Sequence, residues 1–425
     1  MPQFDPVRSA IVGLGGYAGA VRRLFENGHD RGGDHGLDED AAGTLVAVAA
    51  PDLADHPVVV ADLRARGVKV VESFEQLLAI GSVEAVWLPL PIDLHRSFTE
   101  RALAAGKAVM CEKPAAGSVD DVDAMIEARD RAGLPVAIGY QDVYDPTTRV
   151  LKERLLGREI GKVRLVTVWA CWPRADRYYN RSSWAGRLSR NGVWVLDSPA
   201  NNALAHYINI ALFLLGPTIQ ESATPEAVEA ELYRVNPIEN YDTIGMRVTL
   251  SGETQLLVLL THACEKSIGP ITTFHGDRGT VTRLQDRIEL HKPGRDPEVL
   301  ARGPEGGRAF MARRFHRLVR GVEDPEICLA TLESSRPQTV VVSGASEATP
   351  IHCPPDSVIG SVPDDRGGTC TTIKGIESLF EQCIAQEKLL HESGLAAWTR
   401  PSGHRDLRDY RHFAGPASMR ATAAR

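Results

Sequence analysis

The chain has 425 residues, of which 43% are hydrophobic and 24% charged, so it is long enough for two domains with full-sized cores. Its net charge is −7 and its pI is near 6.0, which argues against a nucleic-acid partner because phosphate binding favours a basic surface. Residues 1–8 are polar and lack the apolar core of a secretion signal, and the most apolar windows are too short to span a bilayer. We therefore expect a cytoplasmic protein with no membrane partner.

The seven cysteines are widely spaced, their number is odd, and none forms a Cys-x-x-Cys pair. A disulfide framework or a structural zinc site would need closer and paired spacing. The pattern favours reduced thiols and no bound metal.

The first third of the chain alternates short apolar strands with helices. We expect strands over residues 7–12, 45–50, 85–88, 108–111 and 135–139, with helices between them over residues 20–27, 73–79, 98–105 and 119–132. This alternation predicts a parallel, doubly wound α/β sheet. We place this Rossmann domain at residues 1–145.

The composition changes after about Tyr144, where longer runs of β-type residues appear. Strands are expected over residues 163–172, 243–250, 255–263, 279–284 and 287–291, and helices over residues 146–156, 200–215, 308–321, 330–347 and 372–392. Hairpin-like spacing of the strands predicts an antiparallel sheet. We place this second, α+β domain at residues 146–425.

A glycine-rich turn, Gly13-Leu14-Gly15-Gly16-Tyr17-Ala18, lies between the first predicted strand and helix. Gly13 permits a tight turn, Gly15 lets the backbone approach a pyrophosphate, and Ala18 keeps the helix close to the strand. The helix N-terminus would then offer N–H groups to the phosphates. We expect Gly13, Gly15, Gly16, Tyr17 and Ala18 to bind a dinucleotide; the alternative is an ordinary glycine-rich turn.

The ribose end of the predicted site is less regular. An acidic residue is expected at the end of the second strand, where it accepts from the ribose 2′-hydroxyl, but Ala50 fills that position and Asp52 lies two residues later. The turn has no arginine for a 2′-phosphate. The pattern favours Asp52 as a cofactor ligand and NAD over NADP, without excluding NADP, and leaves open that Asp52 is a turn or capping residue.

Lys113 follows directly after a predicted buried strand, in the segment Cys111-Glu112-Lys113-Pro114. Ligands of open α/β sheets bind beyond the carboxyl ends of the strands. A lysine there would hold a substrate hydroxyl and lower its pKa by its positive charge. Position alone leaves open that Lys113 is a surface residue in a turn.

Three motifs occur in order: the turn at residues 13–18, the Pro89-Leu90-Pro91 segment followed by His95, and the run over residues 104–114 that ends in Glu-Lys-Pro. Together they resemble the glucose–fructose oxidoreductase / inositol dehydrogenase / MocA (Gfo/Idh/MocA) family. The resemblance is good over the first 165 residues and looser to about residue 345. It implies an NAD(P)-dependent oxidoreductase with a Rossmann domain followed by an α+β domain that contains a large open antiparallel sheet.

The resemblance also implies roles for single residues of this chain. Lys113 resembles the catalytic lysine of the family, and Glu112 the acid that lies near the nicotinamide ribose. Pro114 would follow a peptide bond that is often cis in the family. Pro91 and His95 resemble the stretch that lines the adenine and ribose side of the cofactor.

The family's second signature is Asp-x-x-x-His on a helix that opens the second domain. Counting back from Gly216, His206 falls on the histidine, and Asn202 stands where aspartate is usual. Four residues apart on a helix share a face, so we expect Asn202 and His206 to point together toward Lys113. His206 suits general acid/base catalysis, although a packed helix histidine is the alternative. Asp197 would supply the missing carboxylate, or cap the helix.

Aromatic and arginine residues are concentrated over residues 169–194, where Trp172, Arg181 and Trp184 stand out. Aromatic faces stack on sugars, and guanidinium groups bind hydroxyls or carboxylates. These residues, with Tyr140 after the last Rossmann strand, are predicted substrate contacts; a packed loop or a subunit contact is equally open.

We therefore expect a dehydrogenase that moves hydride between a nicotinamide and a secondary hydroxyl of a sugar, polyol or sugar acid. An enzyme of the same family that retains NAD and cleaves glycosides is one alternative, and a non-catalytic NAD- or sugar-binding regulator is another, because Asn202 replaces the usual aspartate. The resemblance also implies a homo-oligomer, a dimer or tetramer that pairs through the open sheet.

Overall fold

A computed structural model of the protein describes residues 5–25, 43–301, 306–322 and 329–419. The chain folds into two compact units. Unit 1 comprises residues 1–116, 121–149 and 304–335, and unit 2 comprises residues 117–120, 150–303 and 336–425. The first unit is therefore completed by a segment that follows most of the second unit in the sequence.

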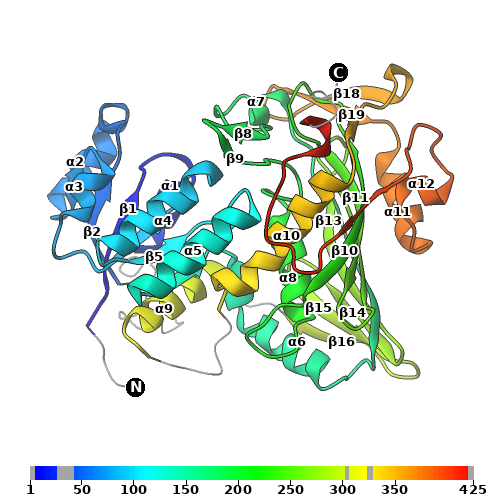
Figure 1. Ribbon diagram of the computed structural model, residues 1–425, viewed down its shortest axis with the longest axis horizontal. Helices are drawn as coiled ribbons and strands as arrows, with labels where there is room; N and C mark the ends of the chain where they lie inside the picture. Colours follow the sequence, from blue (N-terminus) through cyan, green and yellow to red (C-terminus); the bar gives the residue numbers. More distant parts are fainter. Residues whose placement is uncertain (1–4, 26–42, 302–305, 323–328, 420–425) are drawn as a thin grey trace. The chain divides into compact units, whose positions relative to one another are not determined.

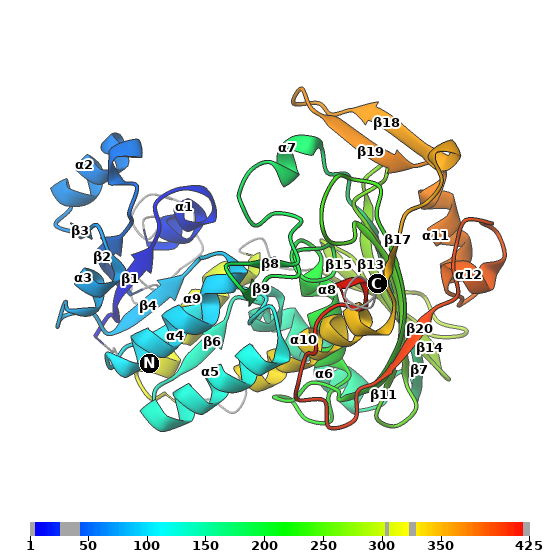
Figure 2. The ribbon, with the colours of Figure 1, turned by 45° about the horizontal axis from the view of Figure 1, so that its top comes forward.

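The sheet of unit 1 has six parallel strands in the order β3-β2-β1-β4-β5-β6, which confirms the predicted doubly wound fold. All residues of β4 and β5 are buried, as expected for parallel strands covered on both faces, where helices lie (Figure 2). The strands are β1 (Arg8–Val12), β2 (Thr44–Ala49), β3 (Lys69–Val71), β4 (Ala85–Leu88), β5 (Ala108–Cys111) and β6 (Val136–Ile138).

Unit 1 contains six α-helices and four short 3-10 helices within its described residues. The α-helices are α1 (Gly16–Arg22), α2 (Pro57–Ala65), α3 (Phe74–Leu78), α4 (His95–Ala104), α5 (Val119–Ala132) and α9 (Gly306–Val319). The 3-10 helices are η1 (Arg23–Phe25), η2 (Leu53–Asp55), η3 (Ile92–Leu94) and η4 (Gln141–Tyr144). The late helix α9 packs on the sheet, where Phe315 meets Trp87 of β4 edge to face with ring centroids 5.6 Å apart.

Unit 2 is built on a large mixed sheet in the order β16-β15-β14-β13-β7-β12-β11-β10-β17, with β20 also paired to β10. Most neighbours are antiparallel, but β7 runs parallel to β12 and β10 parallel to β17. These strands are β7 (Val163–Cys171), β10 (Pro225–Tyr233), β11 (Thr243–Leu250), β12 (Gln255–Thr261), β13 (Ile268–Gly276), β14 (Gly279–Arg283), β15 (Arg287–His291), β16 (Glu298–Ala301), β17 (Ile351–His352) and β20 (Gly403–Asp406). Two hairpins stand apart: β8 (Ser189–Arg190) with β9 (Val193–Trp194), and β18 (Ile359–Pro363) with β19 (Thr369–Ile373).

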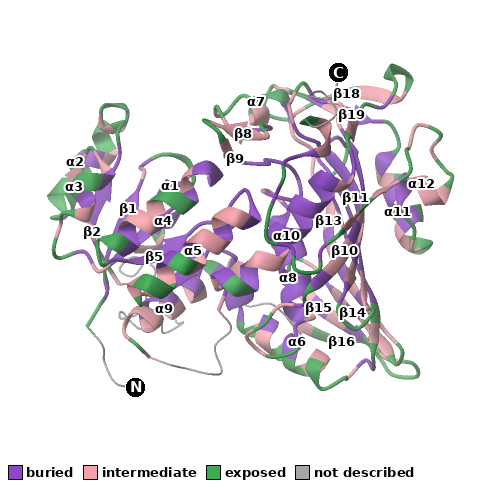
Figure 3. Ribbon diagram, in the orientation of Figure 1, coloured by how far each residue is buried: buried purple, intermediate pink, exposed green. Residues whose placement is uncertain are grey.

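Helices cover both faces of this sheet (Figure 1). α8 (Ala205–Leu214), buried along most of its length (Figure 3), and α10 (Leu332–Ala348) lie on one face, whereas α11 (Ile376–Ala385) and α12 (Leu390–Ser393) lie on the other. Leu257 and Leu259 of β12 share a buried core with Phe380 and Leu390 from that second pair. The remaining elements are α6 (Pro146–Leu156), α7 (Asp176–Tyr179) and the 3-10 turn η5 (Asp356–Val358).

The prediction of one helix over residues 372–392 is wrong. The chain there ends β19, forms α11, turns, and forms α12. Gly375 and Glu387 adopt left-handed φ angles of +75° and +55°, and such residues interrupt a right-handed helix. The six cysteines in the described part of the chain are free thiols, and Cys328 lies outside that part. None of the described helices is both long and apolar enough to cross a membrane.

Candidate cofactor and substrate sites

The glycine-rich turn joins β1 to α1 as predicted, and its first glycine is required by the backbone. Gly13 has φ +106°, and its N–H donates to Ala49 O at 2.7 Å. A Cβ atom on Gly13 would lie 3.1 Å from the Cβ of Ala18. The close approach of strand and helix therefore needs glycine at 13 and a small side chain at 18.

The second glycine of the turn, Gly15, lies next to the side chain of His56. Gly15 is extended at the N-cap of α1, and a Cβ there would lie 3.2 Å from Nε2 of His56. The same Nε2 is 3.3 Å from Oδ2 of Asp52, whose side chain is half exposed. Gly15 and Gly16 carry no side chains and lie at the start of a helix, which fits a pyrophosphate, so the residues present suit a dinucleotide. Sequence reasoning did not identify His56, although its spacing of four from Asp52 was visible.

Glu112 is a buried acid whose pKa is shifted upward. Its side chain is buried after β5, against Gly139, where a Cβ would lie 2.7 Å from Oε2. The backbone N–H of Lys113 donates to the same oxygen at 3.2 Å. Burial raises the pKa of Glu112 to about 7, and the nearby positive charge of Lys113 opposes that rise. Glu112 therefore changes its charge near neutral pH.

Arg308, at the start of α9, brings a cation to the glycine-rich turn. Its Cζ lies 5.2 Å from the centre of the Tyr17 ring, and its Nε donates to Oε1 of Gln141 at 2.8 Å. Burial raises the pKa of Tyr17, and the charge of Glu112 raises it further. Gln141 and Arg308 are 167 residues apart in sequence, so no local pattern indicated this contact.

The Lys113–Pro114 peptide bond is cis, as the resemblance implied. His95 lies behind it and is fully buried. Its Nδ1 is 2.9 Å from Pro114 O and its Nε2 is 2.9 Å from Leu90 O, while burial lowers its pKa. The ring therefore connects two backbone segments and positions the Lys113 turn.

Two further predicted contacts of unit 1 lie close to these segments. Pro91 is the N-cap residue of η3 and is partly exposed. Tyr140 follows β6 and is only 1% exposed, and burial raises its pKa well above the ordinary value. The predicted substrate contact of Tyr140 gains no support from this placement.

Asp197 and Asn202 form a bonded pair in unit 2. Asp197 is buried, its Oδ1 accepts from Nδ2 of Asn202 at 2.7 Å, and its Oδ2 accepts from the N–H of Gly186 at 2.6 Å. Asn240 donates to the backbone carbonyl of Asp197 at 3.2 Å. A carboxylate is therefore held directly beside the asparagine that stands where the family has aspartate.

Asn202 and His206 do not share a regular helix, which corrects the expected helix start at residue 200. α8 begins at Ala205, so His206 lies in its first turn and Asn202 precedes it. Side chains organise the preceding turns instead: Ser198 Oγ accepts from Asn201 N at 3.2 Å, and Asn201 Nδ2 donates to Val195 O at 3.0 Å. Such side-chain bonds compete with helix formation.

The predicted aromatic and arginine residues gather around Tyr178. The Arg181 Cζ lies 3.6 Å from the centre of the Tyr178 ring and 5.1 Å from that of Trp184. Arg174 lies over Tyr178 at 4.8 Å and over Trp172 at 5.6 Å. The contacts therefore join Trp172, Arg181 and Trp184 into one cluster, which also includes Arg174.

This cluster is linked to Asn202 directly and to His206 through its neighbour in the chain. Nδ2 of Asn202 lies 3.5 Å from the Tyr178 hydroxyl, and Trp172 packs edge-on against Tyr207, the neighbour of His206. His262 lies beside this cluster, and its Nδ1 is 2.9 Å from Trp172 O. Burial, and then the charge of Arg174, lower the pKa of His262 to about 3, so this histidine stays neutral.

Comparison with known proteins agrees with the motifs of unit 1. Residues 7–140 match the family model described as oxidoreductase family, NAD-binding Rossmann fold (GFO_IDH_MocA). Residues 7–140 therefore match the NAD-binding Rossmann fold of this oxidoreductase family, which agrees with the resemblance predicted from the motifs.

Curated relatives match over about half of this chain. A dTDP-3,4-didehydro-2,6-dideoxy-alpha-D-glucose 3-reductase from Streptomyces violaceoruber is 26% identical over 243 residues, which are 56% of this chain and 65% of the relative. An inositol 2-dehydrogenase from Rhizobium meliloti (strain 1021) is 24% identical over 51% of this chain and 62% of the relative. The matched segments thus span less than two thirds of these relatives.

Solved structures share the fold more widely. The WlbA dehydrogenase from Bordetella pertussis, in complex with NADH and UDP-GlcNAcA, has a TM-score of 0.64 at 21% identity and covers 81% of this chain and 98% of its own. KijD10, a 3-ketoreductase from Actinomadura kijaniata in complex with TDP-benzene and NADP, has a TM-score of 0.63 at 18% identity, with 83% and 100% covered. At such identities the likeness shows the fold alone.

Proposed function

We propose that the protein is an NAD-dependent dehydrogenase that acts on a secondary hydroxyl of a sugar, polyol or sugar acid. The observation that carries the proposal is Lys113 at the carboxyl end of β5, beside buried Glu112 and in the same unit as a glycine-rich turn suited to a dinucleotide. The relatives described above act on sugars and inositol by their names, which supports the substrate class.

The 13–18 turn, with Glu112 and Arg308 beside its Tyr17, would hold the cofactor. Asp52 would lie toward the ribose. When bound, the nicotinamide accepts or supplies the hydride. NAD is favoured because Asp52 offers a carboxylate acceptor to a ribose hydroxyl. Parallel titrations with NAD and NADP would measure the preference between the two cofactors.

Lys113 would donate a hydrogen bond to the reacting oxygen and stabilise the alkoxide by its charge. His206 would accept the hydroxyl proton in the oxidising direction, because a histidine changes charge near neutrality. Asn202, oriented by Asp197, would bind a neighbouring hydroxyl. The ring cluster around Tyr178 would stack on the sugar.

Assembly into a dimer or tetramer and a cytoplasmic location remain predictions. α11 and α12 cover one face of the sheet over β12 and its neighbours. Any pairing of subunits through that face would have to use the strands that these two helices leave uncovered.

The test is NADH formation across a panel of sugars, polyols and sugar acids. Lys113→Ala and His206→Ala should each lower kcat by about 100-fold or more, the usual contribution of a positioned acid or base. Cofactor binding, followed by fluorescence titration, should be little changed. Exposed Lys69 and His404 supply matched controls, Lys69→Ala and His404→Ala, which should keep full activity.

Retained activity in both catalytic variants would show that the mechanism is wrong. Tight cofactor binding with glycoside cleavage and no net NADH would favour the glycoside-cleaving alternative. Binding of NAD without turnover of any compound in the panel would favour a regulator.

A further inference from the structure

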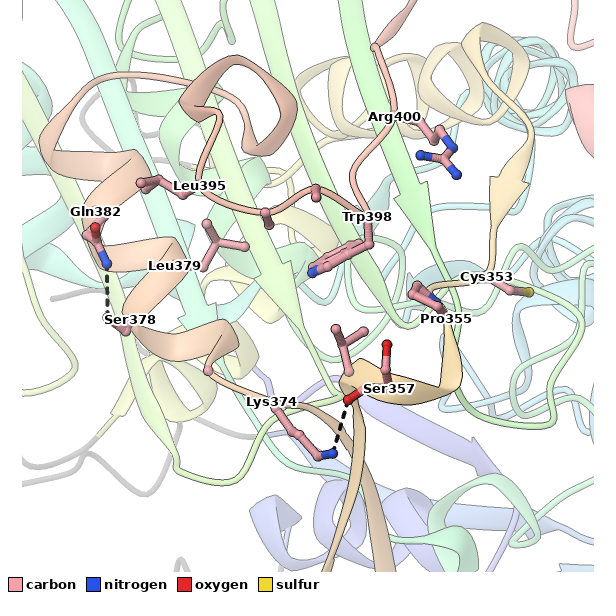
Figure 4. A pocket seen from close by; sticks show the side chains of 14 residues that line it. Cys353, Pro355, Ser357, Lys374, Ser378, Leu379, Gln382, Leu395, Trp398 and Arg400 are labelled. Carbon is pink, nitrogen blue, oxygen red and sulfur yellow. Dashed lines mark hydrogen bonds between the residues drawn. The ribbon is translucent and has the colours of Figure 1, made fainter.

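A cavity of about 860 Å³ lies in the C-terminal part of unit 2 (Figure 4). Three stretches line it: residues 353–358 around η5, residues 374–382 at the start of α11, and residues 395–400 after α12. Its volume is typical of small-molecule sites. None of the residues assigned above to the cofactor or the substrate lines it.

The lining combines two cations with one flat aromatic side chain. Lys374, Arg400 and Trp398 surround the cavity in Figure 4, and none of the residues that line it is acidic. Lys374 Nζ donates to Ser357 O at 3.1 Å, which holds the ammonium at the wall. An ammonium has three donors, and this bond uses one of them.

The nearby carboxylate of α11 is engaged elsewhere. Oε1 of Glu377 accepts from the backbone N–H groups of Glu265 and Lys266 at 2.6 Å and 2.9 Å. Lys374 and Arg400 are exposed, and among the described residues neither contacts a carboxylate. The lining is therefore net positive.

The walls are anchored to the large sheet. The Trp398 ring packs edge-on against Tyr233 of β10, with centroids 4.9 Å apart. The Tyr233 hydroxyl donates to buried Glu231 at 2.7 Å, and Nδ1 of His391 lies 2.8 Å from the same carboxylate. A cavity with anchored walls needs little ordering when a ligand binds.

We propose that this cavity is a second ligand site and that it binds an organic anion of metabolite size. A phosphate or carboxylate group would bind Lys374 and Arg400, and a flat apolar part would pack on Trp398. A cation is a poor fit because no carboxylate lines the cavity. Phosphate and carboxylate ligands share this chemistry, and the experiment distinguishes them.

Cys353 at the edge of the cavity gives a local readout. Of the six described cysteines it is exposed and the other five are buried. The rate of its alkylation by iodoacetamide, followed by peptide mass spectrometry, would be measured on the full-length protein saturated with NAD. We expect 1-naphthyl phosphate, 1-naphthoate or both to slow the alkylation, and neutral 1-naphthol to leave it unchanged.

Charge-removing variants test the assigned residues. Lys374→Ala and Arg400→Ala should each weaken protection by about tenfold, because each removes a charge-assisted hydrogen bond. Lys388 is exposed and lies outside the lining. The anions should therefore protect Cys353 in the Lys388→Ala variant as well as they do in the parent protein. All three positions are exposed, and thermal unfolding would check that the fold is retained.

The proposal is overturned if neither anion protects Cys353 at millimolar concentrations, if 1-naphthol protects equally well, or if protection is unchanged in both cavity variants. Protection by only one anion identifies the group that the site prefers and supports the proposal. Because alkylation does not depend on turnover, these results are independent of the proposed dehydrogenase activity.

Discussion

At the residue scale, the pairing of Asp197 with Asn202 accounts for the departure from the family pattern. An asparagine at 202 donates to a buried carboxylate at 2.7 Å, which an aspartate there could not do. The carboxylate is thus supplied by Asp197, five residues before the position where the family has aspartate. The asparagine and the aspartate function as a pair, and neither can be interpreted alone.

This pairing predicts the effect of restoring the family residue. Asn202→Asp should lower the free energy of unfolding by about 1–3 kcal/mol at neutral pH, because two carboxylates would then lie in contact. The exchange Asp197→Asn with Asn202→Asp should recover part of that stability and of the NADH formation. Urea unfolding and initial rates measure both effects.

The matched control for this exchange is Asn180→Asp, at an exposed position in the same region of unit 2. It should unfold at the urea concentration of the parent. An Asn202→Asp variant as stable as the parent at pH 8 would contradict the pairing.

At the element scale, α12 lies close to the sheet because β11 has a glycine beneath it. A Cβ atom on Gly245 would lie 2.5 Å from Cδ1 of Leu390. Two residues along the same strand, Arg247 binds both carboxylate oxygens of Glu392, each at 2.6 Å. An apolar contact and a two-pronged ion pair therefore fix this helix on the sheet.

Gly245→Val should lower the free energy of unfolding by about 1–3 kcal/mol, the usual cost of overpacking, because the new side chain would push Leu390 from its place. Thermal or urea unfolding measures it. Gly81→Val is the control, since nothing lies within 4 Å of a Cβ at that glycine. Equal effects of the two substitutions would mean that α12 does not pack against Gly245 as described.

At the scale of the whole molecule, the chain leaves unit 1 and later returns to it. Phe315 of α9 packs on Trp87, and Ile138 of β6 donates to Ala330 O at 2.8 Å. Arg308, which belongs to the same returning segment, contacts the ring of Tyr17. Unit 1 is therefore incomplete without residues 304–335.

A fragment of residues 1–149 should consequently fail to unfold cooperatively, because the apolar surface under α9 would be exposed to water. Joining residues 304–335 to it through a flexible linker should restore a cooperative transition and NAD binding. Circular dichroism during heating, together with NAD titration, measures both. A fragment of residues 1–149 that melts cooperatively and binds NAD would contradict this account.

The sequence by itself determined the features that depend on local patterns. The alternation of strands and helices predicted the doubly wound sheet, and the 13–18 turn with Glu112-Lys113-Pro114 predicted the family. These signals are local because a tight turn, a buried parallel strand or a lysine at a strand end each restricts the residue types within a few positions.

The tertiary structure alone decided which distant residues complete those features. Arg308 beside Tyr17, His56 beside Gly15, the pairing of Asp197 with Asn202, and the helices that cover the large sheet all depend on how separate segments pack. The role of each of these side chains depends on its neighbours in space. Those neighbours cannot be predicted from local sequence patterns, because packing and burial determine the long-range contacts.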